Sequence, residues 1–401
     1  MENTRLVVGN PTRGDDFWDR KTEIEEIWRA LEKEHVLLVA PRRFGKTSIM
    51  LNLMDEPRPG YTVFYLDTEW VKGPADFIAE LATQLLKNDT MRRIFAKAGG
   101  VFSKTVNRIK GVQVTQFFKI DLREEVAKDW HNKGREFMSQ IKSFQGRLLL
   151  IVDELPLLVH RMLREDPGEA EDFLYWLRGV RQMPDLPNVR FVIGGSIGIE
   201  HVLKNASTGT KVINDLHRIQ VGPFSEGEAR KFIRTLLRNE ANMEEVSTKV
   251  LDHFMQILET PVPYFAQILV DESMREARKQ GRLLSPQVIT RAYEERVLAA
   301  YNRTYFEHYY ARLGDLYSEE EARLARAFLL EIARRDEVPG ADLWQLYRNL
   351  RQGKGNEEDF SHLLSDLAND FYIQQDPETN GYRFATKVLK DWWLRHYAIT
   401  E

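Results

Sequence analysis

Short apolar runs alternate with helical patterns over the first two-thirds of the chain. The runs are rich in Leu and β-branched residues and occupy residues 35–40, 61–67, 147–153, 189–195 and 217–221. Such runs, separated by helices, are typical of parallel strands that are buried on both faces. The pattern therefore predicts an α/β fold with a doubly wound parallel sheet.

The strand runs stop near residue 222, and residues 223–300 show helical spacing only. Ser225, with Glu228 three residues later, gives a capping-box signal at the start of the first of these helices. We expect this part to be a helical lid. Residues 91–145, between the second and third strand runs, are helical and partly basic, and we assign them no role.

The last hundred residues show a third pattern. Three helical segments are followed by a hairpin signal around the turn sequence DPETNG, and an aromatic helix follows the hairpin. Three helices and a hairpin predict a winged helix-turn-helix. We therefore expect three domains: a core of residues 1–222, a lid of residues 223–300 and a winged-helix domain of residues 301–401.

Composition narrows the function only slightly. Apolar residues make up 43% of the chain, and the net charge of −4 gives no global basic field that would mark a nucleic-acid binder. The absence of cysteine excludes disulfides and thiolate chemistry, and it fits a reducing cytoplasm. No apolar run approaches the roughly 20 residues of a spanning helix, and no signal peptide is visible, so we expect a cytoplasmic protein without membrane contact.

The central motif is the segment Ala40–Thr47, APRRFGKT, between a strand run and a helical segment. It matches the phosphate loop G-x-x-x-x-G-K-[ST] except that Ala40 replaces the first glycine. In such a loop, backbone N–H groups at a helix start converge on phosphate oxygens, the lysine adds a positive charge, and the hydroxyl meets Mg²⁺. We therefore expect ATP and Mg²⁺ to be bound by Pro41, Arg42, Arg43, Phe44, Gly45, Lys46, Thr47 and Ser48.

A second motif is the apolar run LLLIV that ends in Asp153 and Glu154. Asp153, together with Thr47, is expected to hold the Mg²⁺ or its water. Glu154 is expected to orient and deprotonate the attacking water. A third feature is Ser196 after the run VRFVIGG; if that strand lies between the first and third strands, Ser196 points at the γ-phosphate. The alternative is a strand end whose glycines permit tight packing.

The segments NPTRGDDFWDRKTEIEEI, APRRFGKTS, LLLIVDEL and GGSIGIE together resemble the P-loop ATPases of the AAA+ superfamily near its STAND clade. The resemblance implies a P-loop core of the AAA+ (ASCE) type and an ATP-dependent switch; many such proteins serve in signalling, in defence against mobile DNA or in DNA transactions. It gives Lys46 and Thr47 to the phosphates and metal, Asp153 to the metal, Glu154 to catalysis and Ser196 to sensing of hydrolysis.

The same resemblance suggests further nucleotide contacts. The segment from Gly14 to Arg20 would lie over the adenine, with Phe17, Trp18 and Arg20 as candidates, although plain core packing of the aromatic residues is an equal alternative. The family's lid contact lies near a Gly-x-Pro segment, whereas this chain has Pro261-Val262-Pro263-Tyr264 without the glycine.

Such ATPases often use an arginine to stabilise the charge on the transferred phosphate. Arg218, near the last strand run, sits where the resemblance would place this catalytic arginine. Its competitors are Arg178, Arg181 and Arg190, and the loop arginines Arg42 and Arg43 are weaker choices.

The third helix of the predicted winged helix begins Glu357-Glu358-Asp359, ends with Asp366 and Asp370, and carries no Lys or Arg. DNA phosphates would repel this helix, and the release of counterions that drives DNA binding would be missing. We therefore favour a protein partner, or self-association through the lid and winged helix, over DNA.

The sequence thus predicts an ATP-hydrolysing molecular switch that works by positioning and charge neutralisation. Two alternatives share the same phosphate site. One is an ATP-dependent DNA-binding regulator, such as a loader or a transposition regulator. The other is a nucleotide-gated scaffold that binds ATP but barely turns it over.

Overall fold

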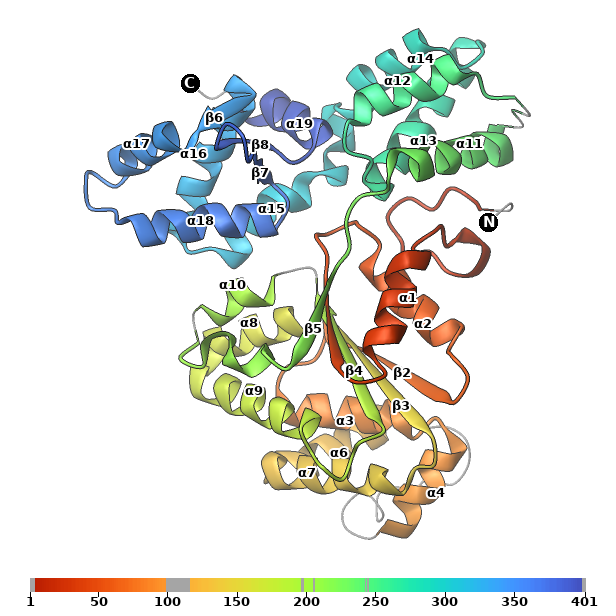
Figure 1. The fold of residues 1–401 in the computed structure, drawn as a ribbon, viewed down its shortest axis with the longest axis vertical. Helices are drawn as coiled ribbons and strands as arrows, with labels where there is room; N and C mark the ends of the chain where they lie inside the picture. The colour runs from red at the N-terminus through yellow and green to blue at the C-terminus, as the bar shows by residue number, and fades with distance from the viewer. Residues whose placement is uncertain are drawn as a thin grey trace. The chain divides into compact units, whose positions relative to one another are not determined.

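A computed structural model describes residues 4–98, 116–195, 198–204, 206–241, 243 and 245–398 of the chain (Figure 1). The chain divides into two compact units. The sheet unit comprises residues 20–40 and 46–221. The helical unit comprises residues 1–19, 41–45 and 222–401, so a five-residue loop within the sheet region belongs to it.

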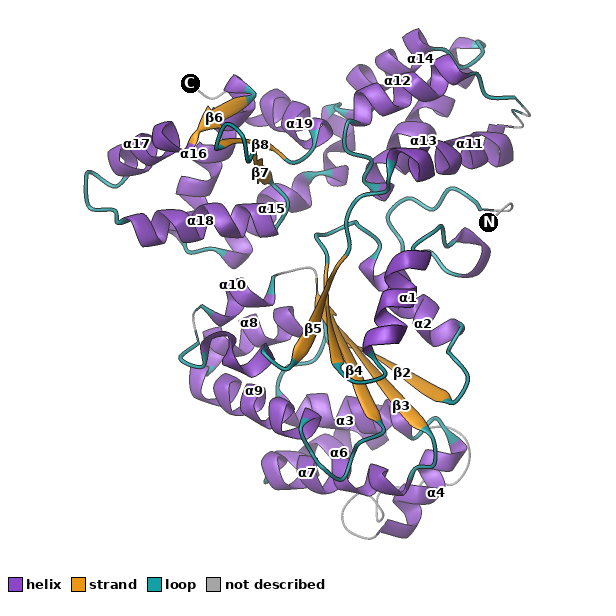
Figure 2. Ribbon diagram, in the orientation of Figure 1, coloured by secondary structure: helices purple, strands orange, loops and turns teal. Residues whose placement is uncertain are grey.

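The sheet unit is built on five parallel strands in the order β2-β3-β4-β1-β5 (Figure 2). All five correspond to the apolar runs of the sequence, so the predicted α/β fold with a parallel sheet is confirmed. Their bounds are β1 His35–Val39, β2 Tyr61–Asp67, β3 Arg147–Asp153, β4 Val189–Gly195 and β5 Leu216–Gln220.

Helices cover both faces of this sheet. Figure 2 shows α1 and α2 on one side and α8 and α9 on the other, as expected for parallel strands that are joined by crossover helices. The segment between β2 and β3 adds helices around α3, and its residues 99–115 lie outside the described residues. The helices are α1 Lys21–Ala30, α2 Lys46–Asp55, α3 Pro74–Leu85, α4 Asp89–Ala98, α6 Gln116–Ala127, α7 Trp130–Gln140, α8 Leu155–Glu165, α9 Pro167–Arg181 and α10 Ile199–Leu203.

The strand order brings three functional segments to one edge of the sheet. Strand β4 lies between β1 and β3, which is the position on which the Ser196 hypothesis depends. Val39 at the end of β1 is level with Gly195 at the end of β4, and Asp67 is level with Asp153. The carboxyl ends of parallel strands, where ligands bind in open α/β sheets, therefore meet beside the start of α2.

The first part of the helical unit contains four helices in the predicted lid region. They are α11 Glu226–Ala241, α12 Thr248–Leu258, α13 Pro263–Gln280 and α14 Pro286–Ala292. Local sequence fixes their starts: Ser225 Oγ accepts the N–H of Glu228 at 3.2 Å, and Ser285 caps α14 with Pro286 as its first residue. The first half of the expected capping box is thus present.

The second part of the helical unit contains the predicted three helices, hairpin and closing helix in order, preceded by a helix, α15, that was not predicted. Its helices are α15 Glu307–Leu316, α16 Glu319–Arg335, α17 Gly340–Leu350, α18 Glu357–Asn369 and α19 Lys387–Tyr397. Strand β6, Glu337–Pro339, was not predicted, and it pairs with β8, Gly381–Phe384, which also pairs with β7, Ile373–Gln375. Asp376 shapes the hairpin turn by accepting the N–H groups of Glu378 and Thr379.

None of the helices in the described part of the chain combines the length and the apolar character that crossing a bilayer requires.

Candidate functional site

The loop between β1 and α2 has the backbone of a phosphate-binding loop. Strand β1 ends at Val39 and α2 begins at Lys46, so the N–H groups of a helix start lie directly after the loop. Gly45 has a φ of +90°, a value that a residue with a Cβ rarely adopts. The glycine of the motif is therefore required by the turn into α2.

Lys46 and Thr47 both bond to the carboxylate at the end of β3. Lys46 Nζ donates to Asp153 Oδ1 at 2.5 Å, and Thr47 Oγ1 donates to Asp153 Oδ2 at 2.8 Å. Both members of the ion pair are buried, with 5% of Lys46 and 2% of Asp153 exposed. The two motifs that lie about a hundred residues apart in the sequence thus meet in one cluster.

Glu154 completes this cluster. Its Oε1 lies 3.6 Å from Lys46 Nζ, and its φ of +58° places a non-glycine residue in the left-handed region just before α8. Burial alone would lower the pKa of Lys46, but the charges of Asp153 and Glu154 outweigh burial and raise it. The ammonium group is therefore charged and ready to meet an anion.

Strand β4 passes so close to the cluster that only glycine fits at its end. A Cβ on Gly194 would lie 2.9 Å from the Leu38 carbonyl oxygen and 3.1 Å from Lys46 Cδ. A Cβ on Gly195 would lie 2.5 Å from Pro156 Cδ. These contacts support the tight-packing explanation of the glycines, while Ser196, the proposed sensor, lies outside the described residues.

Two residues at the end of β2 join the site although the sequence analysis did not single them out. Tyr65 donates its hydroxyl to Asp153 Oδ2 at 3.0 Å. Asp67 lies level with Asp153, and burial raises its pKa, with the charges of Asp153 and Glu154 adding to the effect. The available signal was the strand run YTVFYLD, which ends in a carboxylate as the LLLIVD run does.

The loop residues before Gly45 pack within the helical unit. The Phe44 side chain is buried, and its ring centroid lies 4.6 Å from that of Phe371 in an edge-to-face contact. Tyr309 on α15 donates its hydroxyl to the Arg42 carbonyl oxygen at 3.4 Å. Phe371 lies two residues after the end of α18 and has a φ of +62°, a value that non-glycine residues rarely adopt.

Arg43 is held on the same unit. Its Nη1 donates to the Gly9 carbonyl oxygen at 2.6 Å, and its guanidinium lies 4.6 Å from the ring centroid of Tyr264. Tyr264 belongs to the segment that the sequence analysis compared with the family's lid contact. Burial, together with the charges of Arg42, Arg43 and Arg312, lowers the pKa of His308 to about 3, so its imidazole is neutral near pH 7.

Solved structures of low sequence identity share this arrangement of chain. The Walker-type ATPase of Pyrococcus abyssi is 20% identical, with a TM-score of 0.62 over 97% of this chain and 99% of its own. The ORC2 protein of Aeropyrum pernix, solved as ADPNP–ADP complexes, is 12% identical, with a TM-score of 0.55 over 95% and 96% of the two chains. The chain shares the fold of these two proteins. No family model matches the sequence, and a comparison with curated proteins gives no match either.

The structure places the three residues that were predicted to contact adenine as follows. Trp18 packs against Phe232 of α11, with ring centroids 5.5 Å apart, so it takes part in the core of the helical unit. Phe17 is half-buried, and Arg20 is buried and donates to Glu23 at 2.8 Å. A role of Phe17 and Arg20 in adenine binding stays a prediction.

The arginines that the sequence analysis considered as catalytic groups all have hydrogen-bond or ion-pair partners in the structure. Arg218 on the edge strand β5 pairs with Glu200 at 2.6 Å, and it is about half exposed. Arg181 makes a buried pair with Asp215, and Arg190 donates to three backbone carbonyls. Arg178 donates to Asn214. The packing of Arg181 and Arg190 is structural, and the prediction for Arg218 is untested.

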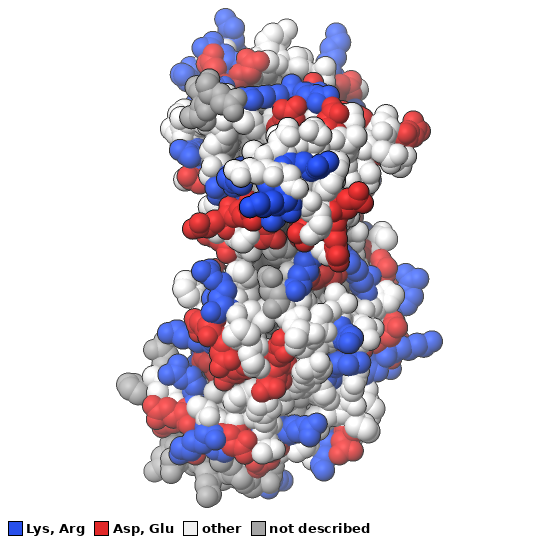
Figure 3. Space-filling view, turned by 90° about the vertical axis from the view of Figure 1, so that its left-hand side faces the viewer, with Lys and Arg blue, Asp and Glu red and all other residues white. Residues whose placement is uncertain are grey.

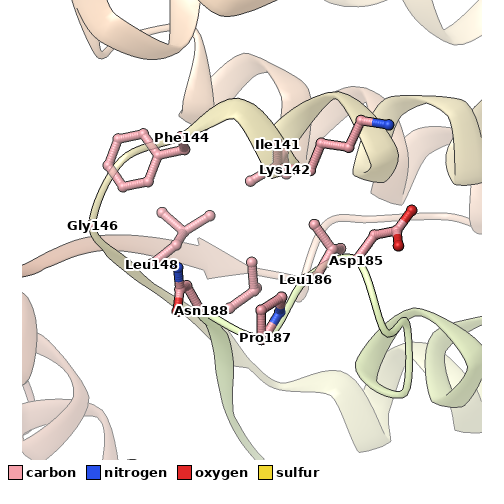
Figure 4. A pocket seen from close by; sticks show the side chains of 10 residues that line it. Ile141, Lys142, Phe144, Gly146, Leu148, Asp185, Leu186, Pro187 and Asn188 are labelled. Carbon is pink, nitrogen blue, oxygen red and sulfur yellow. The ribbon is translucent and has the colours of Figure 1, made fainter.

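A cavity lies at the edge of the sheet opposite to the cluster around Lys46. It has a volume of about 130 Å³ and lies at the amino ends of β3 and β4 (Figure 4). Figure 4 shows Phe144, Leu148 and Leu186 around it, with the charged ends of Lys142 and Asp185 pointing away. A lining of this kind offers no group for phosphate or metal chemistry.

The surface charge agrees with the even composition. Among the described residues on the face shown in Figure 3, basic and acidic side chains are interspersed. On α18, Glu357, Glu358 and Asp359 are exposed, whereas Asp366 and Asp370 are buried, and Asp370 pairs with Arg312 at 2.8 Å. Only the first turn of this helix therefore presents the acidic surface that the sequence suggested for the whole helix.

Proposed function

We propose that this protein binds ATP with Mg²⁺ and hydrolyses it at the γ-phosphate. The observation that carries the proposal is the cluster in which Lys46 and Thr47, at the start of α2, share the carboxylate of Asp153. An ammonium group, a hydroxyl and a carboxylate at a helix start are the groups that a nucleoside triphosphate and its metal require.

The residues present fit Mg²⁺. This ion prefers oxygen ligands and keeps several waters, and the Thr47 hydroxyl and the Asp153 carboxylate lie within hydrogen-bond distance of each other. These two residues would hold the ion, and the phosphates would complete its ligands. When bound, the ion would neutralise charge that develops on the phosphate oxygens.

The side chains of this chain would divide the remaining work. Lys46 would exchange its bond to Asp153 for bonds to phosphate oxygens, because the Asp153 carboxylate would then be a ligand of the metal. Glu154, beside Lys46, would accept a hydrogen bond from the attacking water and take its proton. Catalysis would therefore rest on positioning and charge neutralisation.

Two substitutions separate binding from turnover. We expect Glu154→Gln to keep ATP affinity within about two-fold and to slow phosphate release by about 10²-fold or more, since only the proton acceptor is lost. We expect Lys46→Ala to lose ATP binding in calorimetry. Glu165→Gln, an exposed carboxylate at the far end of α8, is the matched control. Turnover at the wild-type rate in Glu154→Gln would refute the assigned base.

We further propose that hydrolysis acts as a conformational switch. Three consecutive residues of the phosphate loop, from Arg42 to Phe44, contact the helical unit through Tyr309, Tyr264 and Phe371. A nucleotide that reshapes this loop must therefore alter those contacts, which couples the phosphate site to the lid and the predicted winged helix. The exposed acidic start of α18 would face a protein partner, and DNA is not favoured.

A further inference from the structure

Tyr65 bonds to the most deeply buried carboxylate of the site from a neighbouring strand. It is the third residue from the end of β2, and its hydroxyl lies 3.0 Å from Asp153 Oδ2. The same oxygen accepts the Thr47 hydroxyl at 2.8 Å. The other oxygen, Oδ1, accepts Lys46 Nζ and the backbone N–H of Glu154 at 3.0 Å.

These four donors differ in what a nucleotide would do to them. Lys46 and Thr47 both belong to the phosphate loop and the helix after it, so both would turn to the nucleotide and its metal. The N–H of Glu154 is backbone and bonds to Oδ1. Tyr65 is then the one side-chain donor to the Asp153 carboxylate, among those described, that lies outside the loop and its helix.

The chemistry of the phenol suits a permanent donor. A phenol titrates near about 10, so at neutral pH the Tyr65 hydroxyl carries its proton and donates to Asp153. A neutral donor does not neutralise the carboxylate, which therefore stays a strong ligand. Removal of a group that orients a metal-binding carboxylate by hydrogen bonding typically weakens metal binding by about 10- to 100-fold.

We propose that Tyr65 is a positioning residue that holds the Asp153 carboxylate for the Mg²⁺ of the nucleotide. This inference rests on the proposed function and assigns Tyr65 an effect on metal dependence rather than on nucleotide binding itself. Tyr65 does not touch the nucleotide in this scheme, and it acts only through Asp153.

The test compares Tyr65→Phe with Tyr61→Phe in the full chain. Tyr61 lies on the same strand at its opposite end, and its hydroxyl donates to the Leu31 carbonyl oxygen at 3.3 Å, so each substitution removes one phenol hydroxyl from β2. Calorimetry gives the ADP affinity in EDTA and over a series of Mg²⁺ concentrations, and phosphate release gives the Mg²⁺ concentration at half-maximal turnover.

For Tyr65→Phe we expect an ADP affinity in EDTA within about two-fold of wild type and a Mg²⁺ requirement about 10-fold higher. Tyr61→Phe should leave both unchanged. A Mg²⁺ requirement in Tyr65→Phe equal to wild type, or an equal loss of affinity with and without Mg²⁺, overturns the positioning role. If wild type itself bound no nucleotide, the proposed function would fail instead, so the two failures are distinguishable.

Discussion

At the scale of single residues, Lys46 and Asp153 form a buried ion pair. Burying either charge alone would cost several kcal/mol, and the pair with its added hydrogen bonds offsets that cost. Under the proposed function, phosphate oxygens would replace the carboxylate as the partner of Lys46. The affinity for a nucleotide would then reflect an exchange of partners as well as new contacts.

A second residue-scale feature is the neutral imidazole of His35 on β1. Its Nδ1 accepts the N–H of Phe191 at 3.1 Å, so Nε2 carries the proton that it donates to the Arg181 carbonyl oxygen at 2.9 Å. Burial lowers the pKa of His35 from 6.5 to about 4. Protonation would remove the acceptor on which the N–H of Phe191 depends.

This histidine predicts acid sensitivity of the fold. Because the folded pKa lies below the unfolded one, the unfolded chain binds the extra proton, and the contribution to stability is present above pH 6.5 and lost as pH falls toward 4. We expect a loss of about 2 kcal/mol from this group between about pH 7.5 and about pH 5. Urea unfolding of wild type and His35→Gln at both pH values measures it, and an equal pH dependence in the two proteins would contradict the assignment.

At the scale of elements, strand β4 shows how the sheet and the phosphate loop constrain each other. Its last two residues are glycines because the Leu38 carbonyl, Lys46 and Pro156 leave no room for a Cβ. The backbone of β4 thus packs directly against the side chain of Lys46. A substitution in this strand should therefore displace Lys46, although the strand itself would not contact a nucleotide.

Gly194→Ala tests this coupling. The added Cβ would lie 2.6 Å from Met50 Cε and 2.9 Å from the Leu38 carbonyl oxygen; the methionine end can move, but the backbone must shift. We expect a loss of about 1–3 kcal/mol in unfolding free energy and about 10-fold weaker ATP binding. Gly227→Ala in α11, where a Cβ meets nothing within 4 Å, serves as the control and should cost no stability. Unchanged ATP affinity in Gly194→Ala would show that the strand does not support Lys46.

The elements themselves were largely predictable, and the contacts between distant ones were not. The five strands and the helices of the last hundred residues follow from period and turn signals, and the phosphate loop and Asp153 follow from motif chemistry. Strand β6 has three residues and forms by pairing with β8, which is distant in the sequence, so no local signal marks it. The bond between Tyr65 and Asp153 spans 88 residues of sequence, and hydrophobic patterning carries no information on such a pair.

At the scale of the whole molecule, the phosphate loop is part of a unit whose main body comes from the second half of the chain. Residues 41–45 cluster with residues 222–401, although β1 before the loop and α2 after it belong to the sheet unit. Residues 41–45 and the helices of residues 222–401 therefore share one compact unit. This link is the physical basis for the proposed switch.

Phe44→Ala should weaken that link while sparing the groups that bind phosphate. We expect wild type to differ between ATP and ADP in hydrodynamic size by light scattering, and the difference to shrink in Phe44→Ala because the contact with Phe371 is lost. ATP should still bind, since Lys46 and Thr47 remain. Trp70→Ala, at a side chain that is 82% exposed, is a control for removal of an aromatic ring. If Phe44→Ala showed the same difference in hydrodynamic size between ATP and ADP as wild type, the contact between Phe44 and Phe371 would not carry the coupling.

The assignment of the phosphate loop to the helical unit also bears on dissection of the protein. A fragment that ends near residue 222 keeps Lys46, Thr47 and Asp153 but lacks Tyr264, Tyr309 and Phe371. The ring of Phe44 would then meet water, and Arg43 would lose its aromatic partner. Such a fragment should aggregate more readily and bind phosphate less tightly than the full chain, so truncation offers a poor route to an isolated form of the proposed site.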